Sequence, residues 1–139
     1  MTGVIKVNEL QGRTTANDIT VTVGASVTMS LEQGLAKAWA AFHLSGTAAI
    51  DKSLNISSVA DDAAGKSDIS FTNTFTDTDY AGTSMSIQVS AANAYASSLH
   101  YGSNKLTSTC EIWGAYANAG LAGWTDWNDG SISVLGDLA

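Results

Sequence analysis

The stretch Gly34-Leu35-Ala36-Lys37-Ala38-Trp39-Ala40-Ala41-Phe42 decides the fold that we predict for this chain. As a β-strand it places Trp39 on one face with Lys37 and His43, and it lines the opposite face with alanines up to Phe42. A face of small side chains suits close packing of a second sheet or of a neighbouring subunit. A helix is the competing interpretation, because Ala and Leu favour helices. The segment is short and no helical stop signal follows it, so we predict a strand.

The composition of the whole chain also favours β-structure. Of its 139 residues, 45% are hydrophobic, but 21 are alanine, 32 are serine or threonine, and only 14% are charged. A chain rich in Ser, Thr and Gly and poor in Lys and Glu favours an all-β protein over a helical bundle. Because proline is absent, turns must come from Gly, Asn, Asp and Ser. At this length we expect one domain with a small core, plus an arm.

The net charge of −7 argues against binding to nucleic acid or to anionic membranes, because six scattered Lys and Arg cannot form a phosphate-tracking stripe. The N-terminus has no charged segment followed by an apolar one, and no stretch approaches the length of a membrane span. We therefore expect synthesis in a cytoplasm without a cleaved export signal. The single cysteine, Cys110, excludes an internal disulfide, and we expect it to be buried as a small hydrophobic residue.

Residues 1–33 form a polar, Thr-rich arm in which we predict short strands at 3–10 and 18–23. Two short amphipathic strands are marginally stable by themselves, so this arm needs another surface on which to pack. That surface could belong to its own domain, to a sister subunit or to a larger assembly. The apolar residues that would face it are Val4, Ile5, Val7, Leu10, Ile19, Val21 and Val23.

Residues 34–139 show short alternating stretches separated by turn residues, which predicts an antiparallel sandwich or barrel-like domain. Strands are expected at 47–50, at 53–58 with Leu54 and Ile56 facing inward, around 85–89, at 106–116 and at 131–135. The clearest alternation lies at 68–75, where Ile69, Phe71 and Phe75 share one face. Loops are expected at 60–67, 76–80, 91–104 and 114–130. These loops would form the distal or variable surface of the domain, away from the arm.

The chain carries little that indicates catalysis. His43 and His100 do not stand at metal-ligand spacing from one another or from Cys110, and the sequence has neither a nucleophile elbow nor a phosphate loop. We expect no enzymatic activity, no cofactor and no metal site. Asp126-Trp127-Asn128-Asp129-Gly130 superficially resembles a calcium loop, but its Gly falls at the fifth position, where an EF-hand needs it at the sixth. A turn between strands is the interpretation that we favour there.

Aromatic residues gather in the last third of the chain, where Trp113, Trp124 and Trp127 fall within fifteen residues. Exposed Trp and Tyr can stack on sugar rings, whereas core or subunit packing explains such a cluster at least as well. A carbohydrate-binding module at a fibre tip is therefore the alternative function, and it requires these Trp rings to be exposed and coplanar. Its candidate glycan contacts are Tyr95, Tyr101, Trp124 and Trp127.

The run Gly-Leu-Ala-Lys-Ala-Trp-x-x-Phe at 34–42, followed by Gly-Thr-Ala-Ala-Ile at 46–50 and Ser-Leu-Asn-Ile-Ser-Ser at 53–58, resembles small virion proteins of tailed bacteriophages. These are tail-fibre-like or head-decoration proteins, common in phages of marine bacteria and cyanobacteria. The resemblance covers roughly residues 3–81, and the start Gly-Val-Ile-Lys-Val-Asn-Glu-Leu-Gln at 3–11 belongs to it. Residues 65–71 depart from the family pattern, which more often has an aromatic residue before the alternating strand.

The resemblance implies a non-enzymatic, homotrimeric, β-rich appendage on the virion exterior, a capsid decoration or head fibre on one view and a tail fibre on the other. It implies that residues 1–33 anchor the protein to a major capsid or tail protein through the apolar residues named above, and that 34–139 point outward. An Ala-lined strand beside Trp39 would bury well across a three-fold axis, so the expected subunit contacts are Ala36, Ala38, Trp39 and Phe42. The expected partners are further copies of the chain, the particle and a host surface glycan, with no nucleic acid and no membrane.

Overall fold

The computed structural model describes residues 7–11, 19–23, 27–31, 34–87, 94–100, 105–118 and 121–139. The chain divides into two compact units, Met1–Leu35 and Ala36–Ala139. Every regular element in the described ranges is a strand, and these ranges hold no helix that could cross a membrane. The all-β class predicted from the sequence is therefore confirmed.

The first unit contains one antiparallel hairpin, formed by β1 (Thr20–Val23) and β2 (Val27–Ser30). The backbone N–H of Leu31 donates to the carbonyl of Ile19 at 2.7 Å and extends the pairing by one step. The strand expected at 3–10 is not present in its described part, because residues 7–10 lie outside any strand. Residues 1–6 are outside the described ranges.

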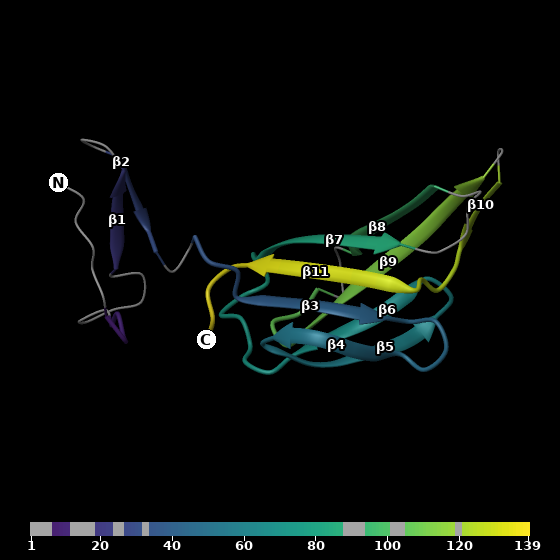
Figure 1. Cartoon of the computed structure of the whole chain (residues 1–139), viewed down its shortest axis with the longest axis horizontal. Helices are drawn as coiled ribbons and strands as arrows, with labels where there is room; N and C mark the ends of the chain where they lie inside the picture. Colours follow the sequence, from purple (N-terminus) through teal and green to yellow (C-terminus); the bar gives the residue numbers. More distant parts are fainter. Residues whose placement is uncertain are drawn as a thin grey trace. The chain divides into compact units, whose positions relative to one another are not determined.

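The second unit consists of two antiparallel sheets, and one of them curls into a half-barrel. Each sheet is four strands across, but the second contains five strands because two short ones follow one another along the same edge of β9. The first has the order β4 (Ala49–Leu54), β3 (Ala38–His43), β11 (Asp129–Leu135) and β7 (Ala81–Ile87). The second contains β5 (Ile56–Ala63), β6 (Lys66–Phe71), β9 (Thr109–Asn118), β8 (Ala94–His100) and β10 (Leu121–Trp124). The long β9 pairs with β8 along one edge and, along the other, first with β6 and then with β10 (Figure 1).

Asn55 is the point at which the chain leaves the first sheet and enters the second. Its backbone is left-handed, with φ of 55°, a conformation that Asn tolerates better than most residues. Its side chain also holds a distant loop, since Oδ1 accepts from the N–H of Asn73 at 2.6 Å and Nδ2 donates to the carbonyl of Asn73 at 3.1 Å. One residue therefore fixes both the corner between the sheets and the loop after β6.

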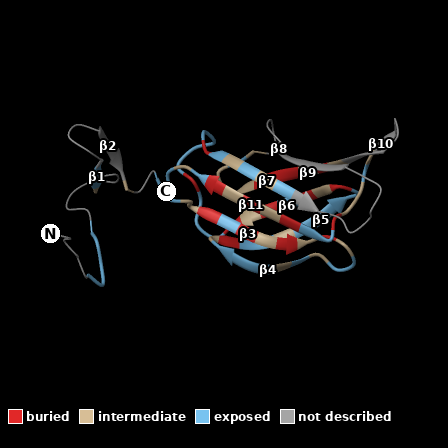
Figure 2. Ribbon diagram, turned by 45° about the horizontal axis from the view of Figure 1, so that its top comes forward, coloured by how far each residue is buried: buried red, intermediate tan, exposed pale blue. Residues whose placement is uncertain are grey.

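The core lies between the two sheets and follows the alternation read from the sequence. Ala38, Ala40 and Phe42 point inward from β3, and buried residues alternate with intermediate or exposed ones along β3 and β11 (Figure 2). Phe71 makes edge contacts with Phe75 and Tyr80, with ring centroids 4.8 and 5.7 Å away. The other buried apolar residues are Leu44, Ile56, Ile69, Cys110, Ile112, Trp127, Ile132 and Val134. The alanine-lined face of β3 thus packs on a second sheet of the same chain.

The structure corrects four further expectations about strands. The loop expected at 114–130 holds the end of β9, which continues to Asn118, and the whole of β10. The loop expected at 91–104 contains β8, which is held by backbone pairing to β9 from Ala94↔Ala117 to His100↔Glu111. The loop expected at 60–67 is shorter, because β5 continues to Ala63 and the turn lies at residues 64–65. Leu54 was expected to face inward but is 49% exposed. A bulge in β4 explains this, since it pairs Phe42 with Ile50 but Ala41 with Lys52, and so turns Leu54 outward beside Trp39.

Candidate functional site

The outer face of the β4-β3-β11-β7 sheet is the most unusual surface of the second unit. The pairing registers place Leu54, Trp39, Ser133 and Thr83 in one row across the four strands. The next row consists of Lys52, Ala41, Ser131 and Met85. Large apolar side chains therefore stand on β4, β3 and β7, and only small side chains lie between them.

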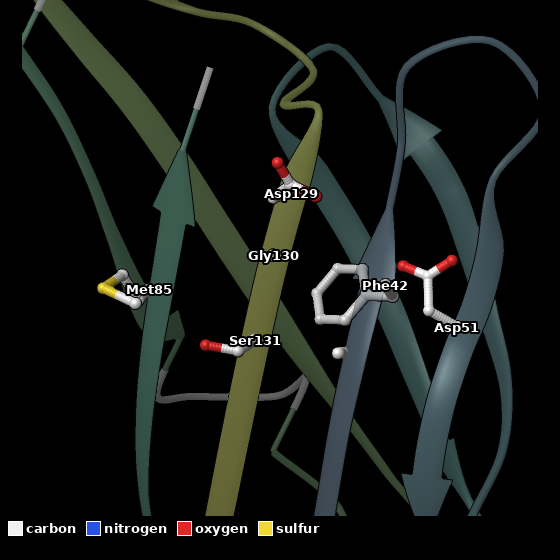
Figure 3. A pocket seen from close by; sticks show the side chains of 7 residues that line it. Phe42, Asp51, Met85, Asp129, Gly130 and Ser131 are labelled. Carbon is white, nitrogen blue, oxygen red and sulfur yellow. The ribbon is translucent and has the colours of Figure 1, made fainter. Parts of the chain in front are cut away.

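These rows leave a hollow of about 420 Å³ that we call the outer trough, lined by Trp39, Ala41, Thr83, Met85, Ser131 and Ser133. An adjoining hollow of about 210 Å³ extends it to Asp51, Asp129 and Gly130. Figure 3 shows Met85 on β7 and Phe42 on β3 on either side of Gly130 and Ser131. Gly130 is needed there because a Cβ would overlap the Trp127 indole and meet the Phe42 ring at 2.9 Å.

Four apolar side chains of this face are exposed to solvent: Trp39 at 38%, Leu54 at 49%, Met85 at 60% and Leu135 at 44%. Lys52 stands on this face beside Ala41, and further charged groups lie toward one end, where His43 Nδ1 is 3.4 Å from Asp51 Oδ1 and Asp129 begins β11. A contiguous apolar patch of this kind on a small protein commonly marks an interaction site. The face therefore suits binding to another surface more than chemistry.

The outer face of the second sheet is polar and is organised around Lys66. Its Nζ lies 2.8 Å from Glu111 Oε1 and 3.1 Å from Asp62 Oδ2, and it also sits 5.0 Å from the centroid of the Trp113 ring. The hydrogen bonds to Glu111 and then to Asp62 raise the pKa of Lys66. Glu111 is only 1% exposed, so its carboxylate is a buried charge held by that ammonium group. The ion pairs of Lys66 with Asp62 and Glu111 thus join β5, β6 and β9 and have a structural role.

Other groups near this face also have shifted pKa values. Burial raises the pKa of Asp68, and the charges of Asp62 and Glu111 raise it further. Burial and the neighbouring carboxylate of Asp126 raise the pKa of Asp61. Burial raises the pKa of the Cys110 thiol to about 12, which makes it unreactive, as its predicted inward position implies. Within the described ranges, no cluster of three or more His, Cys, Asp or Glu could hold a metal ion.

The segment 126–130 serves as a structural turn. Asp126 Oδ1 accepts a hydrogen bond from the backbone N–H of Gly65 at 2.9 Å, and the Trp127 carbonyl accepts from the N–H groups of Leu44 and Ser45. Trp127 itself is 1% exposed, and its ring makes an edge contact with that of Phe42, with the ring centroids 6.4 Å apart. These contacts fix the end of β10 and the start of β11 to the rest of the domain.

The structure also corrects the expected glycan contacts. Trp127 is buried, so it offers no face to a sugar. Trp124 is 53% exposed, but its ring meets that of Trp113 at 88°, so the two cannot form the coplanar platform that the carbohydrate interpretation requires. Tyr101 and the side chain of Tyr95 lie outside the described part of the structure.

The expected subunit contacts separate into two groups. Ala38 and Phe42 are 0% and 1% exposed within a single chain, so they have no surface left for a neighbour, and this corrects the expectation for both. Ala36 is half-buried, and Trp39 stands on the outer face. Leu54, Met85 and Leu135 share that face but were not singled out from the sequence. The alternation around Met85 could have found it, whereas the bulge concealed Leu54.

Three of the four expected anchoring residues whose side chains are described are exposed, and the fourth is half-buried. Val7, Leu10 and Val21 are 56%, 62% and 37% exposed, and Ile19 is half-buried. Val4, Ile5 and the side chain of Val23 lie outside the described part. The first unit thus presents apolar side chains that it does not bury itself.

Comparisons of the chain with protein-family models, with curated proteins and with solved structures found no match.

Proposed function

We propose that this chain is a non-enzymatic structural protein of a tailed bacteriophage particle, a homotrimeric appendage on the virion exterior. In this role the first unit anchors the protein to a capsid or tail protein, and the second unit points outward. The observation that carries the proposal is that each unit exposes apolar side chains that a free-standing monomer would be expected to bury. Val7 and Leu10 do so in the first unit, and Trp39 and Met85 in the second.

The first unit has the properties of an attachment segment. An isolated two-stranded hairpin is marginal in water, and both of its outer edges can accept another strand. Addition of β1 or β2 to a sheet of the particle would satisfy those edges and cover Val21. The resemblance of residues 3–11 and 34–58 to small phage virion proteins points to the same use.

The second unit has the properties of a scaffold. Its polar contacts, such as those of Lys66 with Glu111 and Asp62 and of Asp126 with Gly65, tie strands and turns to one another. Its two sheets enclose one apolar core. A compact β-sandwich of this kind suits a part that must withstand exposure outside a particle.

The proposal is tested by immunogold electron microscopy of phage particles whose genome encodes this chain. We expect gold on the exterior, and its position on head or tail distinguishes decoration from fibre. Absence of the chain from purified particles, or its presence only inside them, would overturn the proposal.

The anchoring role is tested separately with purified protein added to particles that lack it. A Leu10→Lys, Val21→Lys double variant should fail to bind, because lysine cannot be buried cheaply against an apolar surface. Leu106→Lys changes a residue of the second unit that is 48% exposed, and it should bind like the unmodified chain. Equal binding of all three proteins would remove the first unit from the attachment.

A further inference from the structure

We propose that the outer trough is the surface on which a second copy of this chain packs, with the ridge formed by Leu54 and Trp39 of one copy seated in the trough of the next. This inference rests on the homo-oligomer of the proposed function and assigns its contact surface. It replaces Ala38 and Phe42, which are buried within one chain, by residues that are exposed.

The shape of the face supports this assignment. Adjacent strands lie about 4.8 Å apart, so the side chains of β3 and β7, which flank β11, stand roughly 10 Å from one another. Between them lie only Ser131 and Ser133 of β11, and Ala41 on β3 is also small, so a hollow of about 420 Å³ remains. A gap of that width accepts one row of large side chains from a facing sheet, as in sheet-on-sheet packing. The ridge of Leu54 and Trp39 is such a row.

Charge selects this face over the rest of the molecule. A chain with a net charge of −7 repels another copy of itself unless the contact is free of carboxylates. The ridge and the outer trough carry none, whereas the outer face of the second sheet carries Asp62 and Asp68. Where charges do border the face, both signs are present, since Lys52 lies near Asp51. A second copy is therefore tolerated here and disfavoured on the opposite sheet.

The size of the patch is adequate. Its exposed apolar side chains, Trp39, Leu54, Met85 and Leu135, present about 400 Å² of accessible surface, within the range of the largest patches on monomers. A standard interface buries roughly 800 Å² from each partner, so these four side chains would supply about half, and the small residues and the rim would supply the rest. Tryptophan is also the residue most enriched at energetic centres of interfaces.

Trp39 is one wall of the trough and also part of the ridge, but the ridge extends to Leu54 on β4, whereas the floor of the trough lies on β11. A contact that seats the ridge of one copy in the trough of the next therefore joins two different surface patches and is heterologous. Heterologous contacts close into a ring when the rotation between copies divides the full turn evenly. A rotation of one third of a turn gives the homotrimer of the proposed function.

The test is the solution mass of the full chain, measured by light scattering on a sizing column. We expect a mass near three chains for the unmodified protein and near one chain for a Leu54→Lys, Met85→Lys double variant. Leu106→Lys is the control for the Leu54→Lys change, because it places one lysine at a leucine of similar exposure, 48% against 49%, outside the outer trough. It should keep the mass of the unmodified protein. Unchanged far-ultraviolet circular dichroism would show that each variant is folded.

The possible outcomes separate the inference from the proposed function. A trimer that persists in the double variant overturns the inference and leaves the trimer standing. If Leu10→Lys abolishes the trimer but Leu54→Lys, Met85→Lys does not, the inference is overturned and the first unit is the contact between copies. A monomeric unmodified chain overturns both the trimer and the contact.

A second experiment tests the ridge-in-trough geometry directly. In a Leu54→Cys, Ser133→Cys variant the new cysteines are separated by β3, about 10 Å apart within one chain, which is too far for a disulfide. The native Cys110 is buried and does not interfere. Oxidation should therefore link different chains and give a covalent trimer on a non-reducing gel. Absence of linked chains from a trimeric sample would overturn the geometry.

Discussion

Lys66 is the residue on which the polar face of the second sheet depends. The Glu111 side chain is 2% exposed and its carboxylate lies 2.8 Å from Lys66 Nζ, so the loss of that ammonium group removes a close positive partner from a buried negative charge. Asp62 also contacts Lys66, but its own side chain is half exposed and water can replace the amine. The pair with Glu111 therefore matters much more to stability than the pair with Asp62.

We expect Lys66→Met to lower the Tm clearly, while Lys52→Met, at an exposed position on β4, leaves it nearly unchanged. Both changes remove one positive charge from the chain, so the difference between their Tm values reports the loss of the ion pair between Lys66 and Glu111. Thermal unfolding near neutral pH measures the difference. Equal Tm values for the two variants would show that other contacts of Glu111 suffice to hold its charge.

Asp68 gives the protein a pH dependence whose sign follows from its raised pKa. Between the unfolded value of 3.8 and the higher folded value, the folded state binds more protons. The free energy of unfolding contributed by Asp68 therefore falls as pH rises through that interval. We expect Asp68→Asn to raise the Tm near neutral pH and to change it little below pH 3.8, where both forms are neutral.

Unfolding curves recorded across this range test the prediction. Asp137→Asn, at an exposed position near the C-terminus, is the control for a general change in net charge. A Tm gain that is the same for both variants, or the same at all pH values, would attribute the effect to net charge instead of to the surroundings of Asp68.

At the scale of the element, Trp127 closes one end of the sandwich because two strands carry glycine beneath it. A Cβ at Gly114 of β9 or at Gly130 of β11 would overlap the indole. Tight packing of this kind tolerates little added volume. The turn at 125–128 is thus positioned by a side chain that fills the space left by two glycines.

We expect Gly114→Ala to destabilise the domain by about 1–3 kcal/mol, the usual cost of overpacking, and to weaken the near-ultraviolet circular dichroism to which Trp127 contributes. Gly46→Ala is the comparison, because a Cβ there meets open space but must adopt a φ of +80°. It should cost about 1 kcal/mol from backbone strain and leave the aromatic signal unchanged. An unaltered aromatic signal in Gly114→Ala would show that the indole can move aside freely.

The elements also show what the sequence could and could not predict. Strands β3, β6 and β11 were predictable because each has one face on the core, and inward-facing apolar residues therefore recur at every second position. Strand β8 was not, because its assignment rests on backbone pairing with β9, which leaves no such period in residues 94–100. The outward turn of Leu54 depends on the bulge in β4, a register shift without a local sequence signal.

At the scale of the whole molecule, the packing of the second unit could be predicted only in part from the sequence. The alanine-lined face of β3 was compatible with a second sheet or with another subunit, and only the three-dimensional arrangement resolves it in favour of the sheet. The outer trough joins residues from β3, β7 and β11, which are far apart along the chain. No local pattern could have assembled it.

The buried core residues that the structure describes all lie between Ala38 and Val134, which leads to a prediction for the isolated second unit. We expect a fragment of residues 36–139 to fold, with a Tm within a few degrees of the full chain, because no described residue of the first unit belongs to that core. A fragment of residues 36–128 is the control. It lacks β11, which pairs with both β3 and β7 and contributes Ile132 and Val134, so it should not show cooperative unfolding. Thermal unfolding followed by circular dichroism distinguishes the two fragments. If the longer fragment failed to fold, the first unit would have to stabilise the sandwich, and its exposed apolar residues would need an explanation within the chain instead of in the partner that we propose.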